Sequence, residues 1–345
     1  MTRLRRWIFT SGMFVVVIGM FSVVELAVRI FYRHKRVDVE QLLYATGPLE
    51  SYGEELGWSL NPSVVQQIRT GFGDLVTYRT DMRGFRVEED RESSRTEIDV
   101  LFVGDSVTFG TSANKSFPLE FGRISQLKCI NAGVPGYGTD QAFLMTKKVF
   151  ETMGIRPREV VYGFYWNDIA NNTSRVGTDF DERFIVHKPI LNRESKIYER
   201  AEVEKNDLTR KYASPTFLEA LQRILFHSKF LMATWRVVQH NRLLHQQHRP
   251  LPKFDDVAKS YLRENMDQFV TFVRSHQLKF AVLHIEGGHA DLEAQISAWL
   301  EAYCREKRVQ YIRPTLTKED YLPTDFHLSE QGAVSVATAL WKQLQ

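Results

Sequence analysis

The stretch Asp99-Val-Leu-Phe-Val-Gly-Asp-Ser-Val-Thr-Phe-Gly110 decides the fold of this chain of 345 residues. It begins as a continuous run of β-branched and aromatic residues, too short for a comfortable helix, and then changes to small and acidic residues. Such a run predicts a fully buried strand that stops at a turn. Ser106 is therefore expected at the carboxyl end of a strand, where open α/β sheets bind their ligands.

The sequence on either side of this strand alternates apolar runs with helical segments, which is typical of βαβ units and a mainly parallel sheet. Strands are predicted at residues 98–104, 127–131, 159–165, 279–285 and 309–312. Helices are predicted at residues 116–126, 139–153, 289–307 and 329–344, the last capped by Ser329. We therefore expect an α/β fold around a mainly parallel five-stranded sheet.

A long segment, residues 169–278, separates the third predicted strand from the fourth. It is far longer than a usual crossover connection. Residues 169–215 are polar and irregular, whereas residues 216–275 have a strongly helical pattern interrupted at Pro250-Leu-Pro252. Two interpretations stay open for this insertion: a cap beside the sheet edge, or extra helices packed on the back of the sheet.

Residues 1–36 contain a candidate membrane anchor. The run from Trp7 to Val24 carries no charge, and at about 1.5 Å per residue it is long enough to cross most of a bilayer core. No small-x-small cleavage site follows, which argues against a removed signal peptide. We predict one uncleaved transmembrane helix within residues 7–31; the alternative is a buried amphipathic helix.

The orientation of this anchor is predicted from the basic residues around it. Three arginines precede the span, but arginine and lysine residues also follow it, so charge alone sets the orientation only weakly. With the amino-terminal arginines in the cytoplasm, the rest of the chain would lie in the periplasm or outside the cell. The predicted location is the inner, or plasma, membrane of a bacterium.

Residues 37–96 form a lead-in segment between the anchor and the domain of residues 97–345. They are mixed and polar, with short apolar pieces at residues 56–60 and 75–78 that predict strand or strap elements packed on the core. The charged residues 88–97 then predict a solvated loop.

The composition limits the classes of function. The net charge is +3, from 45 basic and 42 acidic residues, and no nucleic-acid-binding motif occurs. Cys129 and Cys304 are too few for a disulfide framework and match no zinc or thioredoxin spacing, so both are predicted to be buried thiols. Neither a Walker lysine nor a Gly-x-Gly-x-x-Gly motif follows the first strand, which disfavours nucleotide binding.

Polar residues also follow the second and third predicted strands. Gly133 lies in the glycine-rich turn of residues 131–138, and glycine lets the backbone approach a ligand closely, so its amide could face a developing negative charge. Asn167 ends an aromatic strand, and its neutral side-chain amide suits an oxyanion. Taken singly, both residues fit a turn or a helix cap equally well.

A histidine with a nearby carboxylate precedes the last predicted helix. A hydroxyl is a poor nucleophile at neutral pH, so Ser106 needs a base that works near pH 7. His327 has that chemistry, and Asp325 could fix the imidazole tautomer and stabilise its protonated form.

Four blocks in this order resemble the SGNH (GDSL-like) hydrolase superfamily. They are Gly104-Asp105-Ser106, Gly133, Trp166-Asn167-Asp168 and Asp325-Phe326-His327. The lead-in pieces Glu55-Leu-Gly-Trp58 and Arg83-Gly-Phe-Arg86 are similar to those of membrane-anchored bacterial members. The usual spacing of the superfamily is Asp-x-x-His, whereas here Thr324 holds that position and Asp325 is one residue closer. Asp320 is a reserve candidate for the acid.

The resemblance implies a three-layer, flavodoxin-like α/β/α fold. It also implies that Ser106 is the nucleophile and His327 the base. The amides of Ser106 and Gly133 would form the oxyanion hole with the side chain of Asn167. No cofactor or metal is implied.

Further polar residues at the predicted strand ends are candidates for substrate binding: Asp105, Tyr137, Asp168, His284 and His289. The pair in His284-Ile-Glu-Gly-Gly-His289 has three interpretations, as the lining of a substrate pocket, as two metal ligands, or as loop histidines bonded within the protein. The metal interpretation is the weakest of the three.

These residues predict a membrane-anchored serine esterase that removes an acyl group, acetyl in the simplest case, from a glycan or lipid-linked substrate. An O-acyltransferase that modifies an extracytoplasmic polysaccharide with the same residues is one alternative, because acceptor choice depends on how well a pocket excludes water. A non-catalytic binding or assembly module that uses residues 169–278 as its interface is the other.

Overall fold

The structure is a computed structural model that describes residues 19–25, 49–69, 75–88, 96–173, 176–181, 184–189, 191–192, 194–195, 197–200, 202–205, 251–322 and 327–345. The chain divides into two units, Met1–Leu43 with Leu208–Leu251, and Tyr44–Asp207 with Pro252–Gln345. In the first unit residues 19–25 are helical. The description below concerns the second unit.

The predicted membrane anchor falls largely outside the described residues. Of residues 7–31, only residues 19–25 belong to the described part. None of the helices in that part is both long enough and apolar enough to cross a membrane. The anchor therefore stays a prediction.

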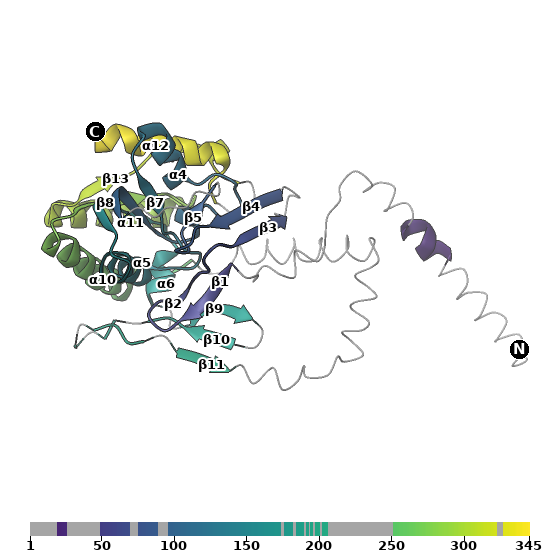
Figure 1. The fold of residues 1–345 in the computed structure, drawn as a ribbon, viewed down its shortest axis with the longest axis horizontal. Coiled ribbons are helices and arrows are strands. Elements are labelled where there is room, and N and C mark those ends of the chain that lie inside the picture. Colours follow the sequence, from purple (N-terminus) through teal and green to yellow (C-terminus); the bar gives the residue numbers. More distant parts are fainter. Residues whose placement is uncertain are drawn as a thin grey trace, which may run out of the picture. The chain divides into compact units, whose positions relative to one another are not determined.

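The centre of the fold is a sheet of eight strands in the order β13-β12-β8-β6-β7-β5-β4-β3 (Figure 1). Its parallel strands are β6 (Glu97–Gly104), β7 (Cys129–Asn131), β8 (Arg156–Phe164), β12 (Lys279–His284) and β13 (Gln310–Ile312). In chain order these five strands have the arrangement 2-1-3-4-5, which is the flavodoxin-like order. The predicted parallel strands are confirmed, each within a few residues of its predicted range.

The prediction of a five-stranded sheet was wrong because the lead-in segment extends the sheet. β3 (Val65–Arg69), β4 (Leu75–Thr80) and β5 (Arg86–Val87) are antiparallel, and β5 joins β7 through the single residue pair Arg86 and Asn131. These strands cover the edge of β7, which would otherwise expose unpaired backbone groups. β1 (Glu50–Gly53) and β2 (Gly57–Leu60) form a separate hairpin.

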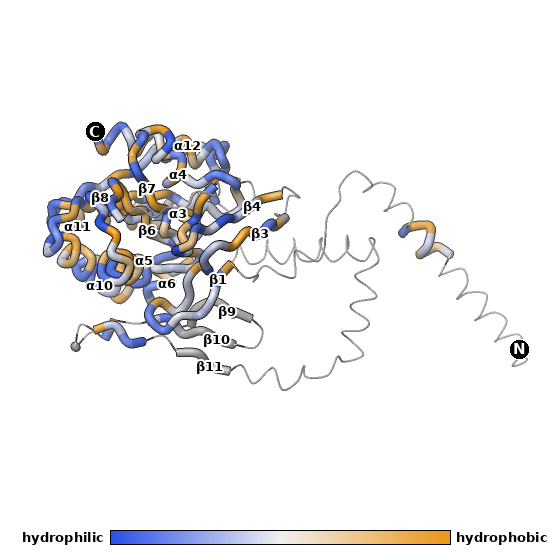
Figure 2. The backbone as a smooth tube through the Cα atoms, viewed as in Figure 1, coloured by the Kyte–Doolittle hydropathy of each residue, from blue (hydrophilic) through white to orange (hydrophobic). Residues whose placement is uncertain are grey.

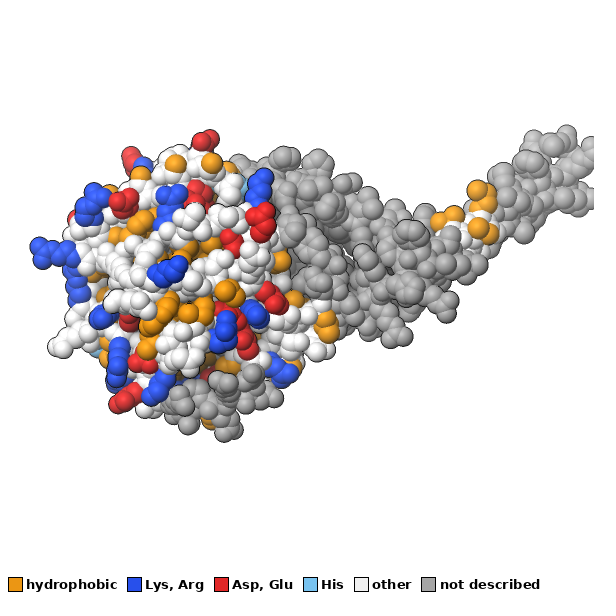
Figure 3. All heavy atoms as spheres, turned by 90° about the horizontal axis from the view of Figure 1, so that it is seen from above, with side chains coloured by type: hydrophobic (Ala, Val, Ile, Leu, Met, Phe, Trp, Pro, Cys, Tyr) orange, Lys and Arg blue, Asp and Glu red, His pale blue; other side chains and the backbone are white. Residues whose placement is uncertain are grey.

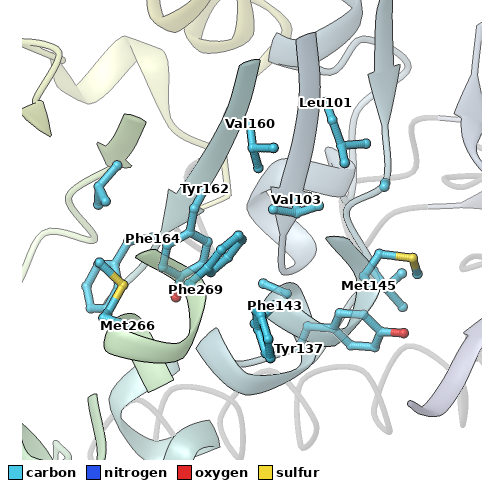
Figure 4. Close-up of a cluster of buried hydrophobic side chains, with 14 of the residues drawn as sticks. Leu101, Val103, Tyr137, Phe143, Met145, Val160, Tyr162, Phe164, Met266 and Phe269 are labelled. Carbon is cyan, nitrogen blue, oxygen red and sulfur yellow. The ribbon is translucent and has the colours of Figure 1, made fainter. Parts of the chain in front are cut away.

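Helices cover both faces of the parallel strands. Val100 and Phe102 of β6 pack with α4 (Phe117–Ser125) and α12 (Glu330–Leu344). Leu101 and Val103 face the other way, toward α5 (Thr139–Lys147), α10 (Asp256–Ser275) and α11 (Ala290–Lys307), a cluster drawn in Figure 4. A π-helical turn, η1 (Lys148–Thr152), continues α5. The arrangement is a three-layer α/β/α fold.

The distribution of residue types agrees with these layers. Hydrophobic residues gather in the central strands, whereas the outer helices alternate hydrophobic and hydrophilic residues along their length (Figure 2). This pattern is expected for helices that bury one face against a sheet. On the face seen in Figure 3, basic and acidic side chains are interspersed among the described residues.

The described residues of the insertion, residues 169–278, include a small sheet of their own and a helix that packs on the central sheet. After α6 (Asp168–Thr173) come three antiparallel strands, β9 (Val176–Asp181), β10 (Phe184–His187) and β11 (Glu202–Lys205), in a stretch predicted to be irregular. Residues 206–250 lie outside the described part. Met266 and Phe269 of α10 belong to the core, so this predicted helix packs on the sheet.

A buried ion pair attaches the insertion to the helical layer. Lys188, directly after β10, places its Nζ 2.6 Å from Oδ2 of Asp140 in the first turn of α5, and both side chains are 2% exposed. The other carboxylate oxygen of Asp140 accepts the Gln141 N–H. Each charge in this dry site depends on its partner, because a lone buried charge loses its hydration without compensation.

We expect Lys188→Met to lower the free energy of unfolding by about 3–5 kcal/mol, because it leaves Asp140 buried without its cation. Lys259→Met is the matched control: Lys259 pairs with the fully exposed Asp256 at 3.6 Å, and such pairs contribute about 0–1 kcal/mol. Urea unfolding of the two variants measures the difference. Equal losses in both variants would contradict this account of the pair.

Glu50, the first residue of β1, has a pKa raised to about 7 by burial. Because the folded chain then holds this proton more tightly than the unfolded chain, the free energy of unfolding should fall as the pH rises from about 4.5 to about 7.

We predict that Glu50→Gln removes this pH dependence and stabilises the protein at pH 8 by about 1–3 kcal/mol, since each pKa unit corresponds to about 1.4 kcal/mol. At about pH 3 the variant and the wild type should unfold at similar urea concentrations, because this pH is below the pKa of Glu50 in both the folded and the unfolded chain, and Glu50 is then protonated in both. A stabilisation of the same size at both pH values would show that the charge of Glu50 is not its cause.

Candidate active site

Ser106 lies at the start of a very short helix. α3 (Ser106–Phe109) follows β6 directly, and Asp105 caps it by accepting the Val107 N–H at 2.8 Å. The helix ends after one turn at Gly110, whose φ of 85° is readily adopted by glycine. As the first residue of the helix, Ser106 has an N–H group without an intrahelical acceptor. Both the hydroxyl and this N–H therefore lie at the carboxyl end of the central strand.

His327 lies at hydrogen-bond distance from Ser106, although 221 residues separate the two in sequence. The distance from His327 Nε2 to Ser106 Oγ is 2.9 Å. Backbone contacts hold His327 and Leu328 against the end of η2: Leu322 donates to the carbonyl of His327 at 2.7 Å, and Tyr321 pairs with Leu328. The structure therefore brings the predicted nucleophile and the predicted base together.

Asp320, the reserve candidate for the acid, lies just before Tyr321 in the chain. It ends the 3-10 helix η2 (Lys318–Asp320) and accepts hydrogen bonds from Thr317 N at 2.7 Å and from the Ser335 hydroxyl at 2.7 Å. Burial raises the pKa of Asp320, but these hydrogen bonds outweigh burial and hold it below its usual value. Both carboxylate oxygens are thus engaged with other residues, so the reserve role is not supported.

Asp325 cannot be placed in the same way. Residues 323–326, which include Thr324 and Asp325, lie outside the described residues. The role of Asp325 as the acid beside His327 therefore stays a prediction.

Asp105 and Asn167 lie beside the nucleophile. Asp105 is completely buried, and burial raises its pKa, against the effects of the Val107 N–H, of His327 and of a hydrogen bond from the Asn167 side chain. Asp105 Oδ2 is 3.5 Å from Ser106 Oγ. The side chain of Asn167 therefore lies beside Asp105, the residue before Ser106. Asp105 caps α3 and is buried, so the prediction that it contacts substrate was wrong.

Gly133 does not have the role expected from the sequence. Its N–H already donates to Oδ1 of Asn131 at 3.0 Å, and the residue is buried. A Cβ at this position would lie 2.5 Å from the backbone nitrogen of Phe109, so glycine is required by close packing against α3. The expectation of a free oxyanion donor at Gly133 is therefore corrected.

Gly136, in the same turn, is a further candidate, which the sequence reasoning did not single out. It is partly exposed and has a φ of 79°. Among the described residues, no acceptor is found for its N–H. The glycine-rich turn pointed to this loop, but several glycines in one turn do not indicate which amide is free.

Three other residues that were predicted to bind substrate lie in the interior of the protein, so that prediction was wrong for them. The hydroxyl of the buried Tyr137 donates to the carbonyl of Trp58 at 2.6 Å. Asp168 is buried, which raises its pKa, and it accepts a hydrogen bond from Tyr162 at 2.8 Å. His284 is completely buried, with its Nε2 atom 2.9 Å from Glu293. The sequence alone does not show whether a polar residue at a strand end bonds to the protein or to a substrate.

His289 stays a candidate for substrate binding. It is partly exposed, and its ring meets the edge of Trp166, the neighbour of Asn167, at a centroid distance of 4.9 Å. No group of three or more potential metal ligands occurs in the part of the chain that the structure describes. His284 and His289 thus have different surroundings, one in the core and one at the surface.

No family model matches the sequence, and no curated protein matches it. Among solved structures the chain is similar to a lipolytic protein of the G-D-S-L family from Desulfitobacterium hafniense, with 11% identity over 72% of this chain and 99% of that one, and a TM-score of 0.40. TesA has 12% identity over 72% and 98% of the two chains, with a TM-score of 0.39.

An acetylxylan esterase from Geobacillus stearothermophilus, Axe2, has 12% identity over 72% of this chain and 94% of its own, with a TM-score of 0.37. All three similarities are at 12% identity or less.

Proposed function

We propose that the chain is a serine ester hydrolase with Ser106 as nucleophile and His327 as general base. The observation that carries the proposal is the 2.9 Å distance between Ser106 Oγ and His327 Nε2. A hydroxyl becomes a useful nucleophile when a base within hydrogen-bond reach can take its proton. Both residues lie at the edge of the sheet where flavodoxin-like folds bind ligands.

In the proposed reaction His327 takes the proton of Ser106 while Oγ attacks the ester carbonyl carbon. The tetrahedral intermediate collapses when the bond to the leaving oxygen breaks, and His327 returns the proton to that oxygen to release the alcohol. Water, activated by the same imidazole, then adds to the acyl-enzyme and releases the acid, which restores Ser106.

The negative charge on the carbonyl oxygen needs donors that are in place before the reaction. We assign this role to the N–H of Ser106 and the side-chain amide of Asn167, which lies beside Asp105. The N–H of Gly136 takes the place predicted for Gly133, because the Gly133 N–H is already bonded to Asn131. Asp325 is proposed to orient His327, as its position in the sequence suggests.

The proposed substrate is a short acyl ester, acetyl in the simplest case, on a carbohydrate or lipid-linked molecule. The predicted anchor at residues 7–31 supports a substrate near a membrane, since a tether confines the enzyme to that surface. The proposed location is the outer side of a bacterial inner membrane.

We predict that Ser106→Ala lowers kcat for a short acyl ester by about 10⁴-fold or more and abolishes labelling by a serine-directed fluorophosphonate. His327→Asn should lower both by a similar factor, because Oγ then keeps its proton. Ser260→Ala, on α10, is the matched control and should leave both unchanged. Undiminished labelling of Ser106→Ala would remove this residue from the mechanism.

A reporter enzyme fused to the carboxyl terminus tests the proposed topology. One reporter that is active only outside the cytoplasm should give full activity, and one that is active only inside should give none, because the amino-terminal arginines favour the cytoplasm. Activity of the second reporter alone would reverse the topology and leave the hydrolase proposal intact.

A further inference from the structure

α3 is too short to satisfy its own backbone. A four-residue helix leaves its last carbonyl groups without intrahelical donors, and such a short helix is not stable on its own. Ser106 is the first residue of this helix, so whatever holds the other end also sets the position of the nucleophile. Two side chains from neighbouring strands hold this end, one by donating to a carbonyl group of α3 and the other by donating to the loop that follows it.

The first is Asn131, the last residue of β7, which is completely buried. Its Nδ2 atom donates to the carbonyl of Thr108 at 3.0 Å and lies 3.1 Å from the Ser116 hydroxyl. Its Oδ1 atom accepts the Gly133 N–H. One side chain thus joins the end of α3 to the turn that follows β7.

The second is Arg86 of β5, the residue paired with Asn131 across the two strands. Its side chain is buried, with Nη1 donating to the carbonyl of Gly110 at 2.8 Å and Nη2 to that of Ala113 at 2.7 Å. The guanidinium also lies 4.6 Å from the ring centroid of Phe109, the last residue of α3.

Strand β4 holds the same loop at two further points. The Ser112 N–H donates to the Tyr78 hydroxyl at 2.7 Å, and the Thr77 N–H donates to Asn114 Oδ1 at 3.0 Å. The ring of Tyr78 lies on the guanidinium of Arg86, 4.7 Å away. The loop after α3 is therefore fixed by the lead-in segment, which lies outside the five parallel strands.

We propose that Arg86 is a positioning residue: by holding the carbonyl groups of the loop at residues 110–114, it fixes α3 and so keeps the Ser106 hydroxyl within reach of His327. The inference rests on the proposed hydrolase function. A guanidinium suits this task because its donors form a planar, rigid fork, which the single ammonium group of lysine cannot reproduce.

The test compares Arg86→Lys, Arg86→Met and Tyr78→Phe in the full chain. Because a misplacement of about 1 Å can cost about 100-fold in rate, we expect kcat and the rate of fluorophosphonate labelling to fall about 10-fold in Arg86→Lys and about 100-fold in Arg86→Met. The KM should change less than about threefold, since a misplaced nucleophile affects the chemical step more than ground-state binding. Tyr78→Phe should give a smaller loss in the same direction.

Arg263→Met is the matched control, since Arg263 is likewise hydrogen-bonded and lies near aromatic rings, but on the outer surface of α10 and α11. It should leave kcat unchanged. Rates are measured well below the melting temperature of each variant. The pH profile of kcat/KM should keep its shape in all variants, because the base is the same.

The outcomes separate the two claims. If the wild type is neither labelled nor active, the proposed function fails. If the wild type is active and the folded Arg86→Lys and Tyr78→Phe variants match its kcat, with only lower melting temperatures, Arg86 is a purely structural residue and the inference is overturned. These two conservative variants decide the question even if Arg86→Met does not fold.

Discussion

The constraint on which the site depends is the length of α3. One turn of helix after β6 gives Ser106 a partly exposed position at the edge of the sheet, but it also leaves carbonyl groups that the helix cannot satisfy itself. Asn131 donates to the carbonyl of Thr108 in α3, and Arg86, its partner across β7 and β5, donates to the carbonyl of Gly110 directly after the helix. The short helix that begins at Ser106 is thus held by the sheet beside it, including a strand that precedes the parallel core in sequence.

The parallel core and the meeting of Ser106 with His327 could be predicted because both depend on local patterns. Strands buried on both faces read as continuous apolar runs, and the carboxyl ends of parallel strands share one edge. The addition of β3, β4 and β5 could not be read in this way. They join the parallel strands through β5, which has only two residues and pairs with a residue more than forty positions later.

The site was predicted less completely than the fold. Glycine at position 133 marks a close approach of two backbone segments, and only the structure shows that its N–H is already used and that Gly136 is partly exposed. His284 and Tyr137 illustrate the same limit, because a polar side chain at a strand end is often bonded within the protein. Burial and partners are properties of the folded chain alone.

The pairing of Arg86 with Asn131 has a consequence for how the chain acquires its structure during synthesis. β5 leaves the ribosome before any parallel strand exists, and its neighbour in the sheet follows about forty residues later, so the lead-in segment must wait for non-local partners. The imidazole of His327 follows the hydroxyl of Ser106 by 221 residues. A nascent chain that has not yet reached residue 327 therefore holds Ser106 without the imidazole that lies beside it in the folded protein.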